Sequence, residues 1–217
     1  MDKDNKIIMV TKSHNIFRDD YKDTLILGDH FNGFKPHKDI QDYERRILSN
    51  YGFMTRKYAE EDHSFKQPIR YVLIVNPLLK KVFSYQRSSG DERLIGKWSW
   101  GLGGHIELVD MNINSNNPIH ESMLRELKEE VDLDTINPKI LGYINHDNAK
   151  EVDRVHFGIL YLAETNKIEI KANSNEIING RFRNIGELEA MCSDPSYDVE
   201  TWSIIALQPL KEYLNSL

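Results

Sequence analysis

Three glutamates lie close together in one stretch of the sequence, at positions 126, 129 and 130. In a helix, residues three and four positions apart share one face, and their Cβ atoms are about 5–6 Å apart. Carboxylates held this close repel one another, so we expect a positive charge beside them. Mg²⁺ prefers oxygen ligands and suits such a cluster. The spacing therefore predicts a metal site, or else a solvated acidic face of the kind that most charged helices carry.

A glycine pair stands upstream of these glutamates, in the segment Gly103-Gly104-His105-Ile106-Glu107. Glycine lets a backbone carbonyl or N–H group approach a ligand closely. A glycine pair alone indicates only a turn. A glycine-rich turn that leads into a helix with three clustered glutamates is much less common than either feature alone, and it favours a functional site.

Together these residues resemble the Nudix box. In that box a glycine is followed, after five residues, by glutamate and, after seven more, by Arg-Glu-apolar-any-Glu-Glu-any-Gly-apolar. Gly104 opens the box here, and residues 125–133 (Arg-Glu-Leu-Lys-Glu-Glu-Val-Asp-Leu) close it. Asp132 stands where the family has glycine, and Asn117 stands where it has glutamate eight residues before the arginine. The loop after Gly104 is about seven residues longer than usual.

The resemblance implies roles for the box residues. Glu126, Glu129 and Glu130 are the expected ligands of Mg²⁺, for which Mn²⁺ is the expected substitute, and the Gly104 carbonyl is a further expected ligand. In the family one glutamate also orients or deprotonates the attacking water, and it lies on the box helix or on a later loop. Glu176 is the later-loop candidate, and the alternative for it is an ordinary surface glutamate.

The box arginine, Arg125, is an expected catalytic-site residue, and the sequence leaves open which acidic residue pairs with it. In the family the first box glutamate pairs with this arginine and orients it. Because Asn117 replaces that glutamate, Asp110 and Glu121 are the two candidates to take over the pairing.

Four further residues are candidates for contact with a substrate. Arg87 and Arg93 suit phosphate, because a guanidinium group can bind phosphate oxygens with two hydrogen bonds. The alternative for both arginines is solvent exposure or an ion pair with Asp91 or Glu92, and it applies above all to Arg93. Tyr85 is a candidate to stack on a base and His105 to contact the substrate, although tyrosine and histidine at such positions are more often structural.

The resemblance implies a metal-dependent hydrolase that cleaves a diphosphate linkage in a nucleoside diphosphate derivative or a similar small phosphorylated substrate. A bacterial subgroup of MutT-like phosphoesterases is similar to this chain around Phe65-Lys66-Gln67 and Glu92-Arg93-Leu94, and it too has an N-terminal extension. One alternative is a non-catalytic Nudix-fold module that binds a nucleotide and regulates another process. The retained glutamates favour catalysis over that alternative and over a purely structural domain.

A helix over residues 118–132 must carry the clustered glutamates. Asn117 is the expected N-cap, and the proline at the first helical position lacks only an N–H group that would be unsatisfied there anyway. Leu124, Leu127 and Val131 recur at helical spacing and predict one apolar stripe.

The remaining hydrophobic patterns predict a layered domain with a mixed sheet. Residues 69–75 and 81–87 read as paired strands. Further strands are expected at 138–145, 152–163 and 167–171, and helices at 185–191 and 198–214. In the N-terminal third, strands are expected at 7–10 and 24–27, a helix at 39–50 and a charged linking segment at 56–65. We therefore expect an α/β (α+β) fold, a Nudix-like α/β/α sandwich over residues 66–217, with an accessory segment over residues 1–65.

The composition restricts the partners and the compartment. The net charge is -6 and the pI about 5.8, without the basic stripe of a general nucleic-acid binder. No segment approaches the length of a membrane-spanning helix. The single cysteine, Cys192, permits no intramolecular disulfide and fits a cytoplasmic location. The expected partner is a small phosphorylated molecule, and a homodimer interface is one role open to the N-terminal third.

Overall fold

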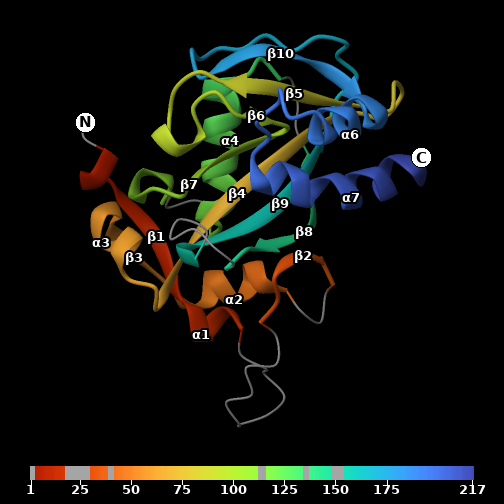
Figure 1. The fold of residues 1–217 in the computed structure, drawn as a ribbon. Coiled ribbons are helices and arrows are strands. Elements are labelled where there is room, and N and C mark those ends of the chain that lie inside the picture. Colours follow the sequence, from red (N-terminus) through yellow and green to blue (C-terminus); the bar gives the residue numbers. More distant parts are fainter. Residues whose placement is uncertain (1–2, 18–29, 39–41, 112–115, 134–136, 148–153) are drawn as a thin grey trace. The chain divides into compact units, whose positions relative to one another are not determined.

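The structure is a computed structural model that describes residues 3–17, 30–38, 42–111, 116–133, 137–147 and 154–217. It contains a mixed sheet and helices, which confirms the predicted fold class. The strands are β1 (Ile7–Lys12), β2 (Gly33–Pro36), β3 (Tyr51–Thr55), β4 (Phe65–Asn76), β5 (Lys81–Arg87), β6 (Trp98–Ser99), β7 (Gly101–His105), β8 (Lys139–Asn145), β9 (His156–Glu164) and β10 (Ile177–Asn184) (Figure 1). The helices are α1 (Ser13–Ile16), α2 (Tyr43–Asn50), α3 (Arg56–Glu61), α4 (Pro118–Glu130), α6 (Ile185–Ser193) and α7 (Thr201–Asn215), with 3-10 turns η1 (Lys3–Asn5), η3 (Glu92–Leu94) and η4 (Leu108–Asp110).

Contacts within the chain define two compact units. Unit 1 comprises Met1–Arg70, Gly104–Ser122 and Gly142–Ile159, and unit 2 comprises Tyr71–Gly103, Met123–Leu141 and Leu160–Leu217. Strands β4, β7, β8 and β9 and helix α4 each contribute residues to both units. The division into an accessory segment, residues 1–65, and a domain, residues 66–217, stays a prediction.

In unit 1, β1 pairs antiparallel with β3, and its last two residues, Thr11 and Lys12, pair with the start of β4. Strand β2 pairs antiparallel with β8. The four central residues of β1 are buried, which confirms the strand expected at residues 7–10. The strand expected at residues 24–27 lies outside the described residues.

Charged side chains stabilise two helices of unit 1, α2 and α3. Helix α2 confirms the helix expected at 39–50 over its described part, and the Asp42 carboxylate caps it by accepting a hydrogen bond from Arg45 N at 3.0 Å. The expectation of a charged linking segment at residues 56–65 is wrong, because α3 and the start of β4 occupy it. Arg56 Nε lies 3.3 Å from Glu60 Oε1, a pair at i and i+4, so these charges support a helix.

In unit 2, β5 pairs antiparallel with β4 on one side and with β10 on the other. The register Val75↔Val82 confirms the expected hairpin. Helices α6 and α7 confirm the two helices expected near the end of the sequence. The strand expected at 167–171 is wrong: these residues form no strand, and the Ile168 side chain is 72% exposed, so its apolar pattern covers no core.

Helix α4 confirms the expected box helix and its N-cap. The Asn117 side chain accepts a hydrogen bond from His120 N at 3.0 Å. The expected place of Leu124 in the apolar stripe is wrong, because Leu124 is exposed. Buried residues recur every four positions instead, at Ile119, Met123, Leu127 and Val131. No helix within the described residues is long and apolar enough to span a membrane.

Replacing Asn117 with alanine removes the cap of α4 and is expected to lower the free energy of unfolding by about 1 kcal/mol, with about 0.5–2 kcal/mol as the range for such caps. Urea denaturation followed by circular dichroism measures this change. Asn117→Ser keeps a capping oxygen and should retain most of the stability. An equal loss in both variants would assign the effect to the Asn117 Nδ2 bond to Glu44 Oε1, at 3.2 Å, and not to the cap.

Candidate active site

The clustered glutamates lie on the part of α4 that belongs to unit 2. Arg125 Nη1 donates hydrogen bonds to Glu126 Oε1 at 2.8 Å and to Glu129 Oε2 at 3.3 Å. The Glu126 side chain is 20% exposed and the Glu129 side chain 58% exposed. One guanidinium group therefore bridges two of the carboxylates and offsets their repulsion, and both remain within reach of solvent.

The end of α4 is held by a neighbouring segment of unit 2. Asn173 N donates to the Glu130 carbonyl at 2.8 Å, and Asp132 N donates to the Lys171 carbonyl at 2.9 Å. Val131 also forms a bridge with Ala172. The bond from Asn173 satisfies a carbonyl that a helix end leaves without a partner inside the helix, and these contacts together fix the position of the last turn.

Strand β5 places Arg87 in the electrostatic field of several acidic groups of unit 2. Its side chain is only 11% exposed, and its Nη2 lies 3.8 Å from Glu176 Oε2. Burial acts to lower the pKa of Arg87, but Tyr85, Glu200, Glu130 and Glu176 together raise that pKa above its usual value. The buried Arg87 Nε has no hydrogen-bond partner among the described residues. Arg87 is thus a fixed cation with an N–H group available for an acceptor.

Glu176 immediately precedes β10 and is brought to Arg87 by backbone contacts. Ser88 N donates to the Glu176 carbonyl at 3.0 Å. Gly90 adopts a φ of +102°, and a Cβ built on it would lie 3.0 Å from Glu176 Oε2 and 3.1 Å from Arg87 Nη2. A glycine at this position leaves room for the pair. The structure thus places Glu176, the later-loop candidate, beside Arg87, the arginine on which the charge of Glu130 also acts.

The other two expected substrate residues of unit 2 are placed differently. The Tyr85 ring is 2% exposed, its hydroxyl donates to the Gly101 carbonyl at 3.1 Å, and that hydroxyl accepts a bond from Arg87 Nη1 at 3.3 Å. Burial raises the pKa of Tyr85, so the phenol stays neutral. Arg93 forms a two-bond ion pair with Asp91, at 2.8 Å through Nε and 2.5 Å through Nη2, which is the alternative that the sequence left open.

Gly104 and His105 belong to unit 1. A Cβ built on Gly104 would lie 2.5 Å from Nη2 of Arg70, a side chain that is almost fully buried, so glycine is needed for this close approach. His105 Nε2 lies 2.7 Å from Gln67 Oε1. These contacts give both residues defined positions within unit 1.

A buried polar network in unit 2 supports the turn before β7. The Glu200 carboxylate is 5% exposed and accepts hydrogen bonds from Tyr71 Oη and from Ser99 Oγ, the latter at 2.6 Å. Ser203 Oγ accepts a bond from Trp100 N at 3.0 Å. Burial, followed by the charge of Glu200, raises the pKa of Tyr71 well above its usual value. The sequence offers no signal for this network, because its members lie far apart in the chain and form no motif.

The comparisons with known proteins decide the family. No protein-family model matches the chain. The protein YmaB of Bacillus subtilis (strain 168) is 31% identical over 211 residues, which cover 94% of this chain and 96% of YmaB. The crystal structure of Tm1382, a presumed Nudix hydrolase, matches with a TM-score of 0.75 at 25% identity and covers 98% of this chain and 100% of that one. The chain belongs to the Nudix hydrolase family.

More distant Nudix structures show the same fold. The Nudix hydrolase from Alicyclobacillus acidocaldarius matches with a TM-score of 0.54 at 12% identity and covers 70% of this chain and 96% of that one. The Nudix domain of Shewanella oneidensis NrtR, solved with ADP ribose, matches with a TM-score of 0.52 at 14% identity and covers 69% of this chain and 88% of that domain. The predicted family and the predicted enzyme type, a Nudix-type hydrolase, are confirmed.

The two departures from the Nudix box have structural explanations. Asp110 stands six residues after Gly104, where the family has its first glutamate, so the additional residues of the box loop can be placed after it. The Asp110 carboxylate accepts a hydrogen bond from Glu107 N at 2.8 Å. Asp132 is not among the described residues with a positive φ, so its replacement of glycine strains nothing. Which of Asp110 and Glu121 orients the box arginine stays a prediction.

The turn of this Nudix domain that the Glu200 network supports should be sensitive to one added methyl group. A Cβ built on Gly101 would lie 2.1–2.5 Å from ring atoms of Tyr71, which is buried. Gly101→Ala is therefore expected to lower the free energy of unfolding by roughly 1–3 kcal/mol. Gly52→Ala is the matched control, because a Cβ there meets nothing within 4 Å. Equal stability of the two variants in urea denaturation would refute the close packing of Gly101.

Proposed function

We propose that this Nudix hydrolase cleaves a diphosphate linkage in a small phosphorylated substrate, with Mg²⁺ bound by Glu126, Glu129 and Glu130. The observation that carries the proposal is the group of carboxylates on α4, two of which share the Arg125 guanidinium, together with Arg87. Arg87 is a mostly buried cation in the field of Glu130, and its Nε has no hydrogen-bond partner among the described residues. A site with both features can hold a metal ion and the phosphate oxygens that the ion also binds.

The donor set on α4 fits a hard divalent cation. The three side chains offer only carboxylate oxygens, which Mg²⁺ and Mn²⁺ accept as ligands. Glu126 and Glu129 already converge on one positive group, the Arg125 guanidinium. A bound Mg²⁺ would neutralise phosphate charge and lower the pKa of a bound water. The Gly104 carbonyl, expected as a further ligand from the resemblance, stays a prediction.

The side chains of the chain have separate roles in the proposed hydrolysis. Arg87 binds phosphate oxygens and offsets the negative charge that grows as water attacks phosphorus. Glu176, or one of the α4 glutamates, accepts the proton of that water. The new P–O bond forms as the bridging P–O bond of the diphosphate breaks, and the leaving phosphate oxygen keeps the electron pair. Arg125 holds the carboxylates in place, and Arg93 already donates two hydrogen bonds to Asp91, which leaves fewer of its donors for a phosphate.

The substrate proposed is a nucleoside diphosphate derivative or a similar small molecule. The ADP ribose bound to the NrtR Nudix domain makes ADP ribose one compound to test, together with nucleoside triphosphates, nucleotide sugars and non-nucleotide diphosphates. A cytoplasmic location, a homodimer and the absence of general nucleic-acid binding stay predictions from the composition. His105 and Tyr85 stay candidates for substrate contact.

Glu129→Gln and Glu130→Gln should each lower turnover by roughly 100-fold or more, since each removes a charged ligand or the base from the site. Phosphate release from the compound panel in Mg²⁺ measures this, first with the unaltered protein. Glu169→Gln is the matched control, because Glu169 is an exposed glutamate of unit 2, and it should leave turnover unchanged.

Two outcomes of this assay would contradict the proposal. Wild-type rates in both glutamate variants would remove the catalytic role of α4. If the unaltered protein bound a compound of the panel in Mg²⁺ and did not cleave it, the alternative of a non-catalytic nucleotide-binding module would be correct.

Arg87→Lys keeps the charge and removes the planar guanidinium fork. Because a hydrogen bond to a charged group contributes about 1.5–3 kcal/mol, we expect kcat/KM to fall roughly 10–100-fold. Arg181→Lys is the matched control, since Arg181 lies on β10 of the same unit with a side chain that is 67% exposed. Equal kcat/KM values for the two variants would show that Arg87 does not bind the reacting phosphate.

A further inference from the structure

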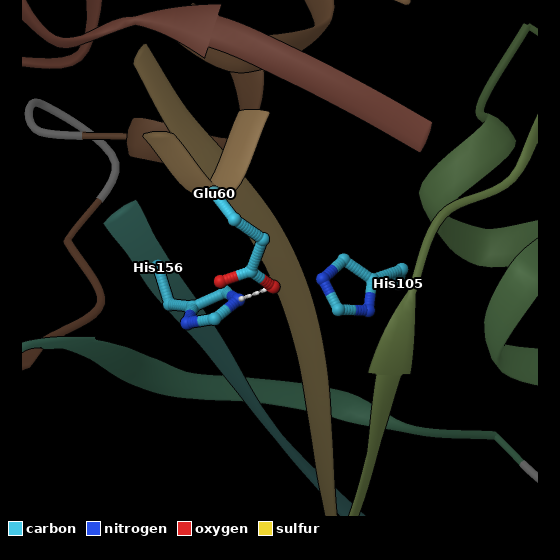
Figure 2. Close-up of side chains that lie close together, drawn as sticks. All are labelled: Glu60, His105 and His156. Carbon is cyan, nitrogen blue, oxygen red and sulfur yellow. Dashed lines mark ion pairs between the residues drawn. The ribbon is translucent and has the colours of Figure 1, made fainter. Parts of the chain in front are cut away.

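A second group of metal-binding side chains lies in unit 1. One carboxylate oxygen of Glu60 and one ring nitrogen each of His105 and His156 lie within 4.8 Å of one another. His156 Nε2 is 3.9 Å from Glu60 Oε1, and the two imidazole rings are 5.4 Å apart between centroids. Figure 2 shows the Glu60 carboxylate between the two rings. We propose that these three side chains bind a divalent transition-metal ion, with Zn²⁺ as the best fit.

The three side chains come from different elements of the same compact unit. Glu60 lies on α3, His105 ends β7 and His156 begins β9. The His156 side chain is 10% exposed and the Glu60 side chain 23% exposed. The group is therefore shielded from most solvent and still reachable by an ion. A chance surface cluster of acidic residues would have neither the burial nor the two imidazoles.

The donor atoms indicate which ion fits. Two imidazole nitrogens and one carboxylate oxygen form a ligand set that zinc accepts, with a fourth position left for water. Mg²⁺ prefers oxygen ligands alone, so the site should discriminate against it. Ligands at about 2.0–2.2 Å from a tetrahedral ion lie roughly 3.3–3.6 Å apart. The largest separation here, 4.8 Å, therefore needs only a small side-chain movement.

The surroundings of the three side chains resemble the outer shell of a metal site. Arg56 Nε contacts Glu60 Oε1 at 3.3 Å, and such a contact holds a ligand side chain in orientation. Gln67 Oε1 lies 2.7 Å from His105 Nε2, so an ion would either take the place of Gln67 at that nitrogen or bind the other ring nitrogen, Nδ1. Gln67 is fully buried, and its Nε2 has no hydrogen-bond partner among the described residues. A buried amide N–H group without an acceptor is costly, so an additional acceptor beside Gln67 would be stabilised.

The competing interpretation is a simple ion pair between Glu60 and a protonated histidine. That arrangement needs no metal and would not distinguish Zn²⁺ from Mg²⁺. The two interpretations therefore differ in a direct binding measurement, which does not require the hydrolase activity or knowledge of its substrate.

The experiment uses the full chain, freed of metal with a chelator. Isothermal titration calorimetry with Zn²⁺ and with Mg²⁺ measures affinity and stoichiometry, and circular dichroism confirms that each variant is folded. Glu60→Gln, His105→Gln and His156→Gln should each weaken Zn²⁺ binding by roughly tenfold or more. Zn²⁺ should also raise the Tm of the unaltered protein by more than it raises the Tm of these variants.

Two kinds of control separate this site from the rest of the chain. Glu61→Gln and His63→Gln alter exposed neighbours of Glu60 and should leave Zn²⁺ binding unchanged. Glu129→Gln alters the α4 cluster and should also leave the site of unit 1 intact. Absence of Zn²⁺ binding to the unaltered protein, or equal Zn²⁺ affinity in a folded Glu60→Gln variant, would overturn the proposal. Either result would leave the hydrolase proposal untouched.

Discussion

Charge compensation on the last turns of α4 is the constraint on which the rest of the site depends. Carboxylates on adjacent turns repel one another unless cations stand beside them. In unit 2, Arg125 bridges two of the carboxylates, and Arg87 lies in the field of the third. A metal ion bound to these glutamates, as proposed, would add a second positive group to the one that Arg125 already supplies.

Arg125 and Arg87 can compensate the charge of the carboxylates only because the surrounding backbone is fixed. The bonds from residues 171–173 hold the end of α4, and the backbone contact of Ser88 brings Glu176 to Arg87. The Glu200 network and the close approach of Gly101 to Tyr71 fix the position of Gly101, whose carbonyl accepts the hydrogen bond from the Tyr85 hydroxyl. A chain of buried polar contacts thus connects α7 to the orientation of Arg87, and most of its members take no part in chemistry.

The sequence predicts the elements and the central cluster well, and the long-range contacts poorly. Helix α4 is predictable because its N-cap, its proline and its acidic spacing are local signals. Leu124 shows the limit of such reasoning, because it was expected in the apolar stripe and packing buries Met123 in its place. Arg93 shows the same limit, since its pairing with Asp91 was one of several chemically sound alternatives.

Residues that act together across long sequence separations leave no pattern to detect. Glu200 and Tyr71 belong to segments that meet only after folding, as do Glu60, His105 and His156. Because α3 occupies residues 56–61, Glu60 has a fixed position, which the charged sequence of this segment does not indicate. A charged stretch can be a helix whose side chains pair with one another, and hydrophobic periodicity alone does not reveal it.

The distribution of Glu60, His105 and His156 along the chain has a consequence for folding. Joining them closes two long loops, between residues 60 and 105 and between residues 105 and 156. The unfolded chain loses conformational entropy when such loops are closed, and the loss grows slowly with loop length. A chain with a single cysteine cannot obtain this restraint from an internal disulfide. Coordination by these three segments would provide an equivalent cross-link that is reversible and depends on ion supply.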